Sequence, residues 1–212
     1  MPYQNRVDPF GQLVATSARS TLMGNRGCLH DAGDRPLRQY QSRRWIVCVL
    51  DFKGRKKAPM PPGKYTSLFF LDEATALAAG HRPCAECQRA RFTEFRHHWA
   101  AANPELAGGA TPSVDTIDSA LHRERLSDHY YQRDKTKRTY TALLKDLPDG
   151  VLVLGAGKTP HLVRGDALYP WSFDGYGSPV ERPDAEVQVL TPHSTVCAIA
   201  HGYVPVMKIE GR

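Results

Sequence analysis

The chain has 212 residues, of which 41% are hydrophobic and 24% are charged, and its formal net charge is +6. This composition excludes a disordered or fibrous protein, and the length suffices for one domain or two small ones. No apolar stretch approaches the length of a membrane span, and the polar N-terminus is unlike a signal peptide, so we expect no membrane association.

The chain contains five cysteines, an odd number, which favours metal binding in a reducing compartment over a disulfide framework. We therefore expect a cytoplasmic protein. The positive net charge permits nucleic-acid binding without requiring it. Residues 209–212, IEGR, are typical of a protease recognition sequence added for expression, and the fold prediction leaves them out.

The N-terminal segment mixes turn residues with short apolar patches, and residues 12–15 predict a strand. A glycine-rich loop at 24–35 contains Cys28 and His30, whose side chains would face the same side of an extended segment. Either residue could supply a metal ligand. Alternatively, the segment is a surface loop with a free thiol.

Residues 43–52, RRWIVCVLDF, alternate in the pattern of a strand and place Cys48 among apolar neighbours. This cysteine is either a buried core thiol or a third zinc ligand. The following loop is basic, so it is either a surface that contacts phosphates or a solvated charge cluster.

Residues 65–99 combine a buried strand at 68–71, a helix at 74–79 capped by Asp72, and a second helix at 88–101. Between the helices, a turn of the form G-x-R-P-C-x-x-C carries Cys84 and Cys87. Two thiolates at this spacing can bind one tetrahedral zinc ion. A thioredoxin-like pair is disfavoured because that motif follows a strand and opens a helix. Two unrelated free thiols are the remaining alternative.

A cysteine on a strand, followed after a gap by F-x5-A-L-A-A-G-x-R-P-C-x-x-C, resembles the N-terminal zinc domain of the Ada DNA-repair family. The matching residues are Cys48, Phe70, Ala76, Leu77, Ala78, Ala79, Gly80, Arg82, Pro83, Cys84 and Cys87. That family holds zinc with four cysteines, one of which accepts a methyl group from a phosphotriester in DNA. The resemblance implies that Cys48, Cys84 and Cys87 are zinc ligands. Outside this segment the chain has only the general character of bacterial zinc proteins.

One ligand of that family is missing, because Phe52 stands where its second strand cysteine would be. Cys28, His30 and Asp51 are the candidates for the fourth position. We predict His30, because imidazole is a good zinc ligand and the side chain reaches further than that of cysteine. A neutral imidazole also makes the site less negative and its sulfurs less nucleophilic, which weakens the prediction of methyl transfer.

The small and turn-rich segment 102–113 predicts a boundary between an Ada-like zinc-binding part, 1–103, and a C-terminal part, 114–208. A helix predicted at 114–126 carries Asp115, Asp118 and His122 on one stripe. These residues could bind a hard metal ion or perform acid–base chemistry, as in a hydrolase. A solvated helix face with ordinary charge pairing is the favoured alternative.

Residues 129–140 interleave basic residues with tyrosines, a pattern that suits a nucleic-acid groove but also an exposed segment with inward-packed rings. Together with the loop after Cys48, the candidate nucleic-acid contacts are Lys56, Lys57, Arg133, Lys135, Lys137 and Arg138. Strands are expected at 151–155, 161–164, 167–173 and 187–190. The intervening GAGKTP lacks the spacing of a phosphate-binding loop and predicts a hairpin turn.

These features together predict an α+β protein with a zinc-stabilised strand–helix–turn unit and a small antiparallel sheet with helices in the C-terminal part. The leading functional hypothesis is a zinc protein that binds or acts on nucleic acid, in DNA repair if the resemblance holds. The alternatives are a hydrolase-type enzyme that uses Asp115, Asp118 and His122, with zinc purely structural, and a protein-interaction module. The sequence does not decide whether there is any catalysis.

Overall fold

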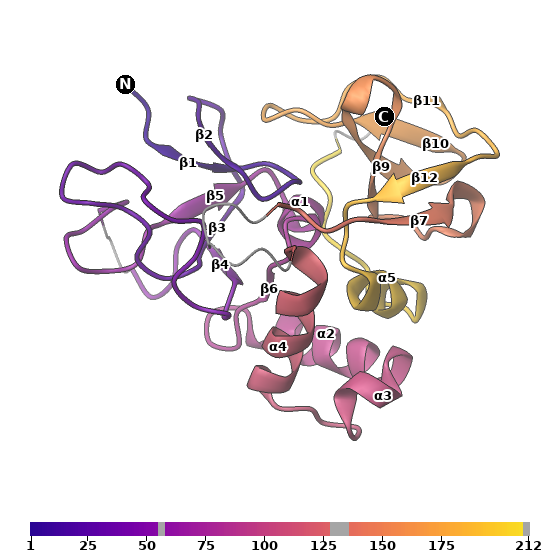
Figure 1. Ribbon diagram of the computed structural model, residues 1–212, viewed down its shortest axis with the longest axis horizontal. Helices are drawn as coiled ribbons and strands as arrows, with labels where there is room; N and C mark the ends of the chain where they lie inside the picture. The colour runs from indigo at the N-terminus through magenta and orange to yellow at the C-terminus, as the bar shows by residue number, and fades with distance from the viewer. Residues whose placement is uncertain (55–57, 128–135, 210–212) are drawn as a thin grey trace.

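A computed structural model describes residues 1–54, 58–127 and 136–209, and it shows two six-stranded sheets accompanied by helices (Figure 1). The sheet formed by the N-terminal residues lies on one side of the molecule and the sheet formed by the C-terminal residues on the other. Helix α1 lies between them, and α2, α3 and α4 gather at one end (Figure 1). The predicted α+β class is therefore confirmed.

The first sheet has the strand order β2-β1-β5-β3-β4-β6. Two of its pairings, β1 with β5 and β4 with β6, are parallel, and the others are antiparallel. The predicted strands at 12–15, 43–52 and 68–71 are all present, although the second is shorter than expected. The strands are β1 (Gln4–Val7), β2 (Leu13–Ala15), β3 (Leu22–Asn25), β4 (Ile46–Val49), β5 (Leu68–Phe70) and β6 (Arg82–Pro83).

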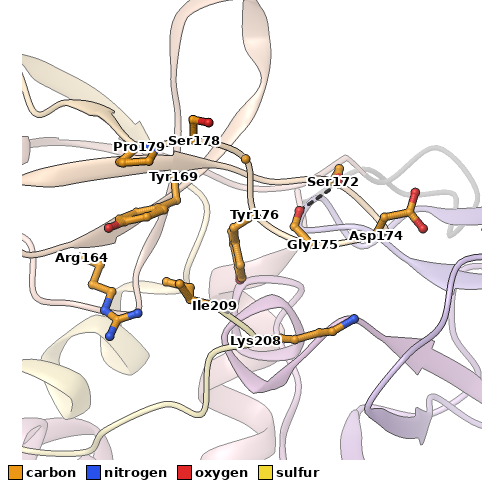
Figure 2. A pocket seen from close by; sticks show the side chains of 11 residues that line it. Arg164, Tyr169, Ser172, Asp174, Gly175, Tyr176, Ser178, Pro179, Lys208 and Ile209 are labelled. Carbon is orange, nitrogen blue, oxygen red and sulfur yellow. Dashed lines mark hydrogen bonds between the residues drawn. The ribbon is translucent and has the colours of Figure 1, made fainter. Parts of the chain in front are cut away.

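The second sheet is antiparallel throughout, with the order β11-β10-β9-β8-β12-β7. A cavity of about 660 Å³ lies beside it, with Arg164, Tyr169 and Tyr176 in its wall (Figure 2). The GAGKTP turn joins β8 to β9, as predicted. The strands are β7 (Tyr140–Leu143), β8 (Leu152–Leu154), β9 (Pro160–Arg164), β10 (Ala167–Pro170), β11 (Val180–Glu181) and β12 (Glu186–Val189).

Four helices cover one end of the molecule and share a core with the second sheet. They are α2 (Arg89–Ala102), α3 (Pro104–Ala107), α4 (Val114–Arg125) and α5 (His193–Ala200). Helix α3 is an addition to the predicted elements and lies inside the segment expected to be a boundary. Phe95 and Trp99 of the first predicted part pack in one cluster with Val153 and Ile199 of the second. The two predicted parts therefore share a hydrophobic core.

Helix α1 (Glu73–Ala78) is buried along its whole length because it is packed between the two sheets. Its Ala76 belongs to the cluster of the first sheet, whereas Ala74 and Ala78 belong to a cluster with β8 and β9. Small side chains are needed on both faces for a helix to fit between two sheets. Asp72 caps the helix as predicted, and its carboxylate accepts a hydrogen bond of 2.8 Å from the backbone N–H of Thr75.

Candidate metal centre

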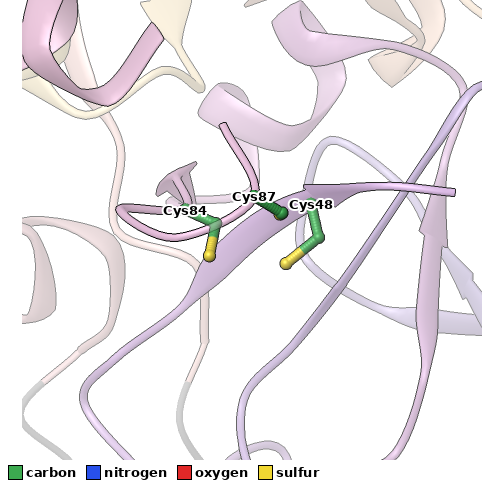
Figure 3. Close-up of side chains that lie close together, drawn as sticks. All are labelled: Cys48, Cys84 and Cys87. Carbon is green, nitrogen blue, oxygen red and sulfur yellow. The ribbon is translucent and has the colours of Figure 1, made fainter. Parts of the chain in front are cut away.

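Three cysteines come together because β4 and β6 run side by side in parallel. Val47 lies opposite Pro83, the last residue of β6, so the residues that follow them, Cys48 and Cys84, are also neighbours. The backbone N–H of Cys84 extends this pairing by donating a hydrogen bond of 2.9 Å to the carbonyl of Val47. Cys87 follows at the end of the turn that leads into α2. The strand and the turn thus bring the three cysteines side by side (Figure 3).

The sulfur atoms of Cys48, Cys84 and Cys87 all lie within 4.8 Å of one another. A tetrahedral zinc ion with Zn–S bonds of about 2.3 Å would hold its sulfurs about 3.8 Å apart, so a small contraction closes the cluster on the ion. Soft thiolates select zinc and similar ions over hard cations such as magnesium or calcium. The three residues therefore fit a zinc ion, and the sequence had indicated the same three.

The thiols of Cys48 and Cys84 have pKa values that are shifted in opposite directions. A hydrogen bond with Cys48, together with the backbone N–H groups of Cys87 and Glu86, lowers the pKa of Cys84 to about 5. The hydrogen bond with Cys84, followed by burial, raises the pKa of Cys48. The N–H of Glu86 lies 3.4 Å from the Cys84 sulfur. The hydrogen bond between Cys48 and Cys84 thus favours the thiolate of Cys84 over that of Cys48, and a metal ion bound by both sulfurs would have to displace the proton of Cys48.

A cavity of about 310 Å³ adjoins the cluster, and all three cysteines lie in its wall. Its remaining wall comes from β3, β4, β5 and the loops beside them. Most of these side chains are apolar or aromatic. The wall residues other than the cysteines are Met23, Asn25, Ile46, Val49, Leu50, Phe52, Pro59, Tyr65, Ser67, Phe69 and Glu86. Sequence analysis did not single out the wall residues of β3 and β5, since only pairing between strands brings them beside Cys48.

The predicted fourth ligand, His30, lies outside the group of cysteines. Its Nδ1 lies 2.6 Å from the hydroxyl of Thr66, and its Nε2 has no hydrogen-bond partner among the described residues. The thiol of Cys28 is directed to the carbonyl of His30, and Asp51 is exposed. No other histidine, cysteine or carboxylate in the described chain joins the three sulfurs. A role for His30 in metal binding stays a prediction.

The motif that precedes the cysteines is anchored by α4. Gly80 has a φ of +90°, and the guanidinium of Arg125 donates a hydrogen bond of 2.8 Å to its carbonyl. Arg82 forms a two-pronged ion pair with Asp118, with distances of 2.9 and 2.8 Å, and both side chains are 2% exposed. Contacts with α4 thus hold the G-x-R-P segment in place immediately before Cys84.

The three residues of the predicted catalytic stripe each have a different partner. Asp118 is held by Arg82, and Asp115 forms an exposed ion pair of 3.0 Å with Arg44. His122 lies 3.1 Å from the guanidinium of Arg125. In the described part of the chain these residues do not form a compact group of potential metal ligands. The contacts are charge pairs, as the favoured interpretation of this stripe expected, but that interpretation was wrong in making the whole face solvated, because Asp118 is buried.

Of the six candidate nucleic-acid contacts, the structure describes two. Lys56, Lys57, Arg133 and Lys135 lie outside the described residues. Lys137 is directed inward, where its ammonium group donates to the carbonyl of Ala78. Arg138 is exposed. A groove lined by all six residues therefore stays a prediction.

Sequence analysis also missed a buried cluster of cations behind the metal-binding turn. Arg26 and Arg125 are at most 1% exposed, and their guanidinium carbons lie 3.8 and 4.0 Å from the centre of the Trp45 ring. Burial is the main reason that the pKa of Arg26 falls to about 9. No spacing in the sequence connects these residues, which come from three separate segments.

The fold and the site define an α+β protein with a three-cysteine centre suited to a soft metal ion. Comparison with known proteins gave no match: no family model fits the sequence, and no curated protein or solved structure is significantly similar to it. The similarity to the Ada family therefore rests on the motif alone. No helix in residues 1–54, 58–127 and 136–209 combines the length and hydrophobicity needed to cross a lipid bilayer.

Proposed function

We propose that the protein binds one zinc ion through Cys48, Cys84 and Cys87 and uses the surface around this centre to bind nucleic acid. The observation that carries the proposal is the group of three sulfurs within 4.8 Å of one another, at the wall of a cavity. The similarity of the motif to a DNA-repair family supports the choice of partner. A cytoplasmic location belongs to the proposal, because these thiols must stay reduced to bind metal.

Charge near the centre supports an anionic partner. Lys53 and Lys64 are exposed and directly adjoin Phe52 and Tyr65, two aromatic residues of the cavity wall. The ammonium group of Lys53 lies 5.1 Å from the centre of the Phe52 ring. Phe52 and Tyr65 are half-buried, and cations beside such rings suit a strand whose phosphates pair with the cations and whose bases stack on the rings. The net charge of +6 acts in the same direction.

The zinc part of the proposal is tested by metal analysis of the purified protein. We expect one zinc per chain, and we expect Cys84→Ser to lose the ion. Cys197→Ser is the matched control, because Cys197 lies on α5, away from the cluster, and should retain zinc. A wild-type protein that folds fully without bound metal would refute this part.

The nucleic-acid part is tested by titrating random duplex and single-stranded DNA at two salt concentrations. The logarithm of the affinity should fall with the logarithm of salt by about 0.7–0.9 per phosphate contact. The double variant Lys53→Ala/Lys64→Ala should reduce that slope by about two contacts. Lys145→Ala, in the short helix that follows β7, should leave it unchanged. The absence of binding to either DNA at low salt would remove nucleic acid from the proposal and leave the zinc site intact.

A further inference from the structure

We propose that the zinc ion keeps its fourth coordination position open toward the adjoining cavity, and that this position binds an external thiol with an apolar or aromatic body. The inference rests on the zinc-binding part of the proposed function and adds a ligand class to it. It does not depend on nucleic-acid binding, since Lys53 and Lys64 are not among the residues of the cavity wall and the ligand would occupy the interior.

The number of donors is the first reason. Protein-bound zinc takes four ligands, and sites with three protein ligands keep the fourth for water or substrate. In the described chain, Cys48, Cys84 and Cys87 form a group of three potential ligand atoms that no fourth residue joins. Nδ1 of His30 forms a hydrogen bond of 2.6 Å with the hydroxyl of Thr66, and Asp51 is exposed. The described residues thus supply three of the four ligands that zinc takes.

The position of the cavity is the second reason. All three cysteines are part of its wall, so a ligand in the cavity lies within reach of an ion held by their sulfurs. Its volume of about 310 Å³ is at the lower end of the usual range for small-molecule sites. The rest of the wall is mainly apolar, with Ile46, Leu50, Phe52 and Phe69 among its residues. A compact apolar or aromatic ligand would bury its surface there.

The chemistry of the ion selects the donor atom. Three thiolates give the Zn²⁺ centre a net charge of −1 and supply much electron density, which makes the zinc a weak activator of bound water. Such a centre prefers another soft donor, and sulfur is the softest that biological ligands offer. When a thiol binds, its S–H bond breaks, the proton passes to solvent, a Zn–S bond forms and a bound water leaves. No oxidation or reduction takes place.

The test uses the full chain with cobalt(II) in place of zinc, because the visible bands of cobalt report the number of sulfur ligands. The resting protein should show three sulfurs and one lighter atom by X-ray absorption. Phenylmethanethiol should add a fourth sulfur and intensify the sulfur-to-cobalt bands in a saturable way. Benzyl alcohol, which has the same ring and no sulfur, should leave these bands unchanged.

Variants of the cavity wall separate binding in the cavity from simple metal scavenging. Phe69→Ala should weaken phenylmethanethiol binding about tenfold, which corresponds to about 1.4 kcal/mol. Phe173→Ala, beside the second sheet, should leave it unchanged. Leu50→Ala and Leu143→Ala are a second pair, since both leucines are exposed surface residues and we expect both variants to fold as the wild type does. Equal thiol affinity in both members of each pair would overturn the cavity as the binding site.

Two results would overturn the open position while leaving zinc binding in place. A resting shell of four sulfurs that becomes three in Cys28→Ser would show that Cys28 closes the site. A shell of three sulfurs and one nitrogen that resists the thiol, and that changes in His30→Ala, would show that His30 does so. Absence of any stoichiometric metal would instead refute the proposed function itself. If the fourth position is open as proposed, Cys28→Ser and His30→Ala both bind metal and thiol as the wild type does.

Discussion

Gly80 links the central helix to the Cys-x-x-Cys turn, and two properties of its position require glycine. Its φ is +90°, and a β-carbon built there would lie 2.6 Å from Cδ of Arg125. The first property favours glycine through backbone sterics, and the second through the space that the arginine side chain occupies. The residue therefore combines the role of a helix end with that of a packing site for Arg125.

We predict that Gly80→Ala destabilises the protein by more than the roughly 1–3 kcal/mol typical of a strained backbone, because Arg125 must also move. Gly108→Ala is a matched control, since Gly108 ends α3 with a φ of +63° and nothing lies within 4 Å of its added β-carbon. Urea unfolding of the two variants measures the difference. Equal losses of stability would show that the Arg125 contact contributes nothing.

Lys137 is a second residue whose role depends on burial. Desolvation, with repulsion from Arg125 and Arg26, lowers its pKa from 10.5 to about 7. The unfolded chain keeps the ordinary pKa, so between these two values it binds more protons than the native protein. Stability contributed by this group therefore rises with pH across that window and is constant below it.

We predict that the wild type gains stability relative to Lys137→Met as the pH rises from 7 to 9. The gain should be at most about 1.4 kcal/mol per pH unit, the value of one pKa unit. Urea unfolding of both proteins at pH 6, 7, 8 and 9 measures it. Between pH 6 and 7 the difference should change little, and a difference that stays constant up to pH 9 would contradict the buried ammonium group.

At the scale of elements, helix α1 determines how closely the two sheets approach. All six of its residues are buried, and alanine recurs on the faces directed to each sheet. Asp72 at its N-terminus also accepts hydrogen bonds from the hydroxyl of Tyr176 and the N–H of Lys208, each at 2.8–2.9 Å. The helix cap thus ties the first sheet to the second and to the C-terminal segment.

We predict that Ala78→Leu destabilises the protein by about 1–3 kcal/mol, because extra methyl groups in a filled core force neighbouring atoms apart. Ala78 is fully buried against the second sheet. Ala90→Leu, at an exposed position of α2, should change stability by less than about 0.5 kcal/mol. Thermal unfolding of both variants gives the comparison, and a neutral effect of Ala78→Leu would indicate unfilled space between the helix and the sheet.

At the scale of the whole molecule, the three-cysteine centre is coupled to both sheets. Cys48 and Cys84 join β4 to the turn, Arg82 joins that turn to α4 through Asp118, and α4 packs into the core that includes β8 and β9. Metal binding to the folded state stabilises it by linkage, and the shared core distributes that stability. Loss of the ion should therefore affect residues far from the cysteines.

We predict that chelation of the metal lowers the unfolding midpoint and that both sheets still unfold in a single transition. Amide hydrogen exchange at β4 and at β9 measures the two sheets separately, and protection at both should fall together. Cys84→Ser should reproduce the effect without chelator. Protection retained at β9 alone would indicate that residues 1–103 and 114–208 unfold independently, in agreement with the predicted boundary.

Local features of this protein were determined by the sequence alone. The Asp72 cap, the left-handed Gly80, the Cys-x-x-Cys turn and the alternating strand around Cys48 all follow from interactions between residues close in the chain. For that reason the α+β class and the three cysteines could be predicted. The strands β1, β3, β6, β7 and β11 were missed because they are short and lack a clear alternation.

Only the tertiary structure decided how distant segments meet. The parallel pairing of β4 with β6 sets Cys48 beside Cys84, while His30 is engaged by Thr66. Packing likewise pairs Asp118 with Arg82, although the sequence pattern had allowed a catalytic role for Asp118. It also directs Lys137 inward, although the sequence pattern had allowed this residue to contact nucleic acid. Strand register and core packing depend on the summed burial of many residues, so they cannot be predicted from any short motif.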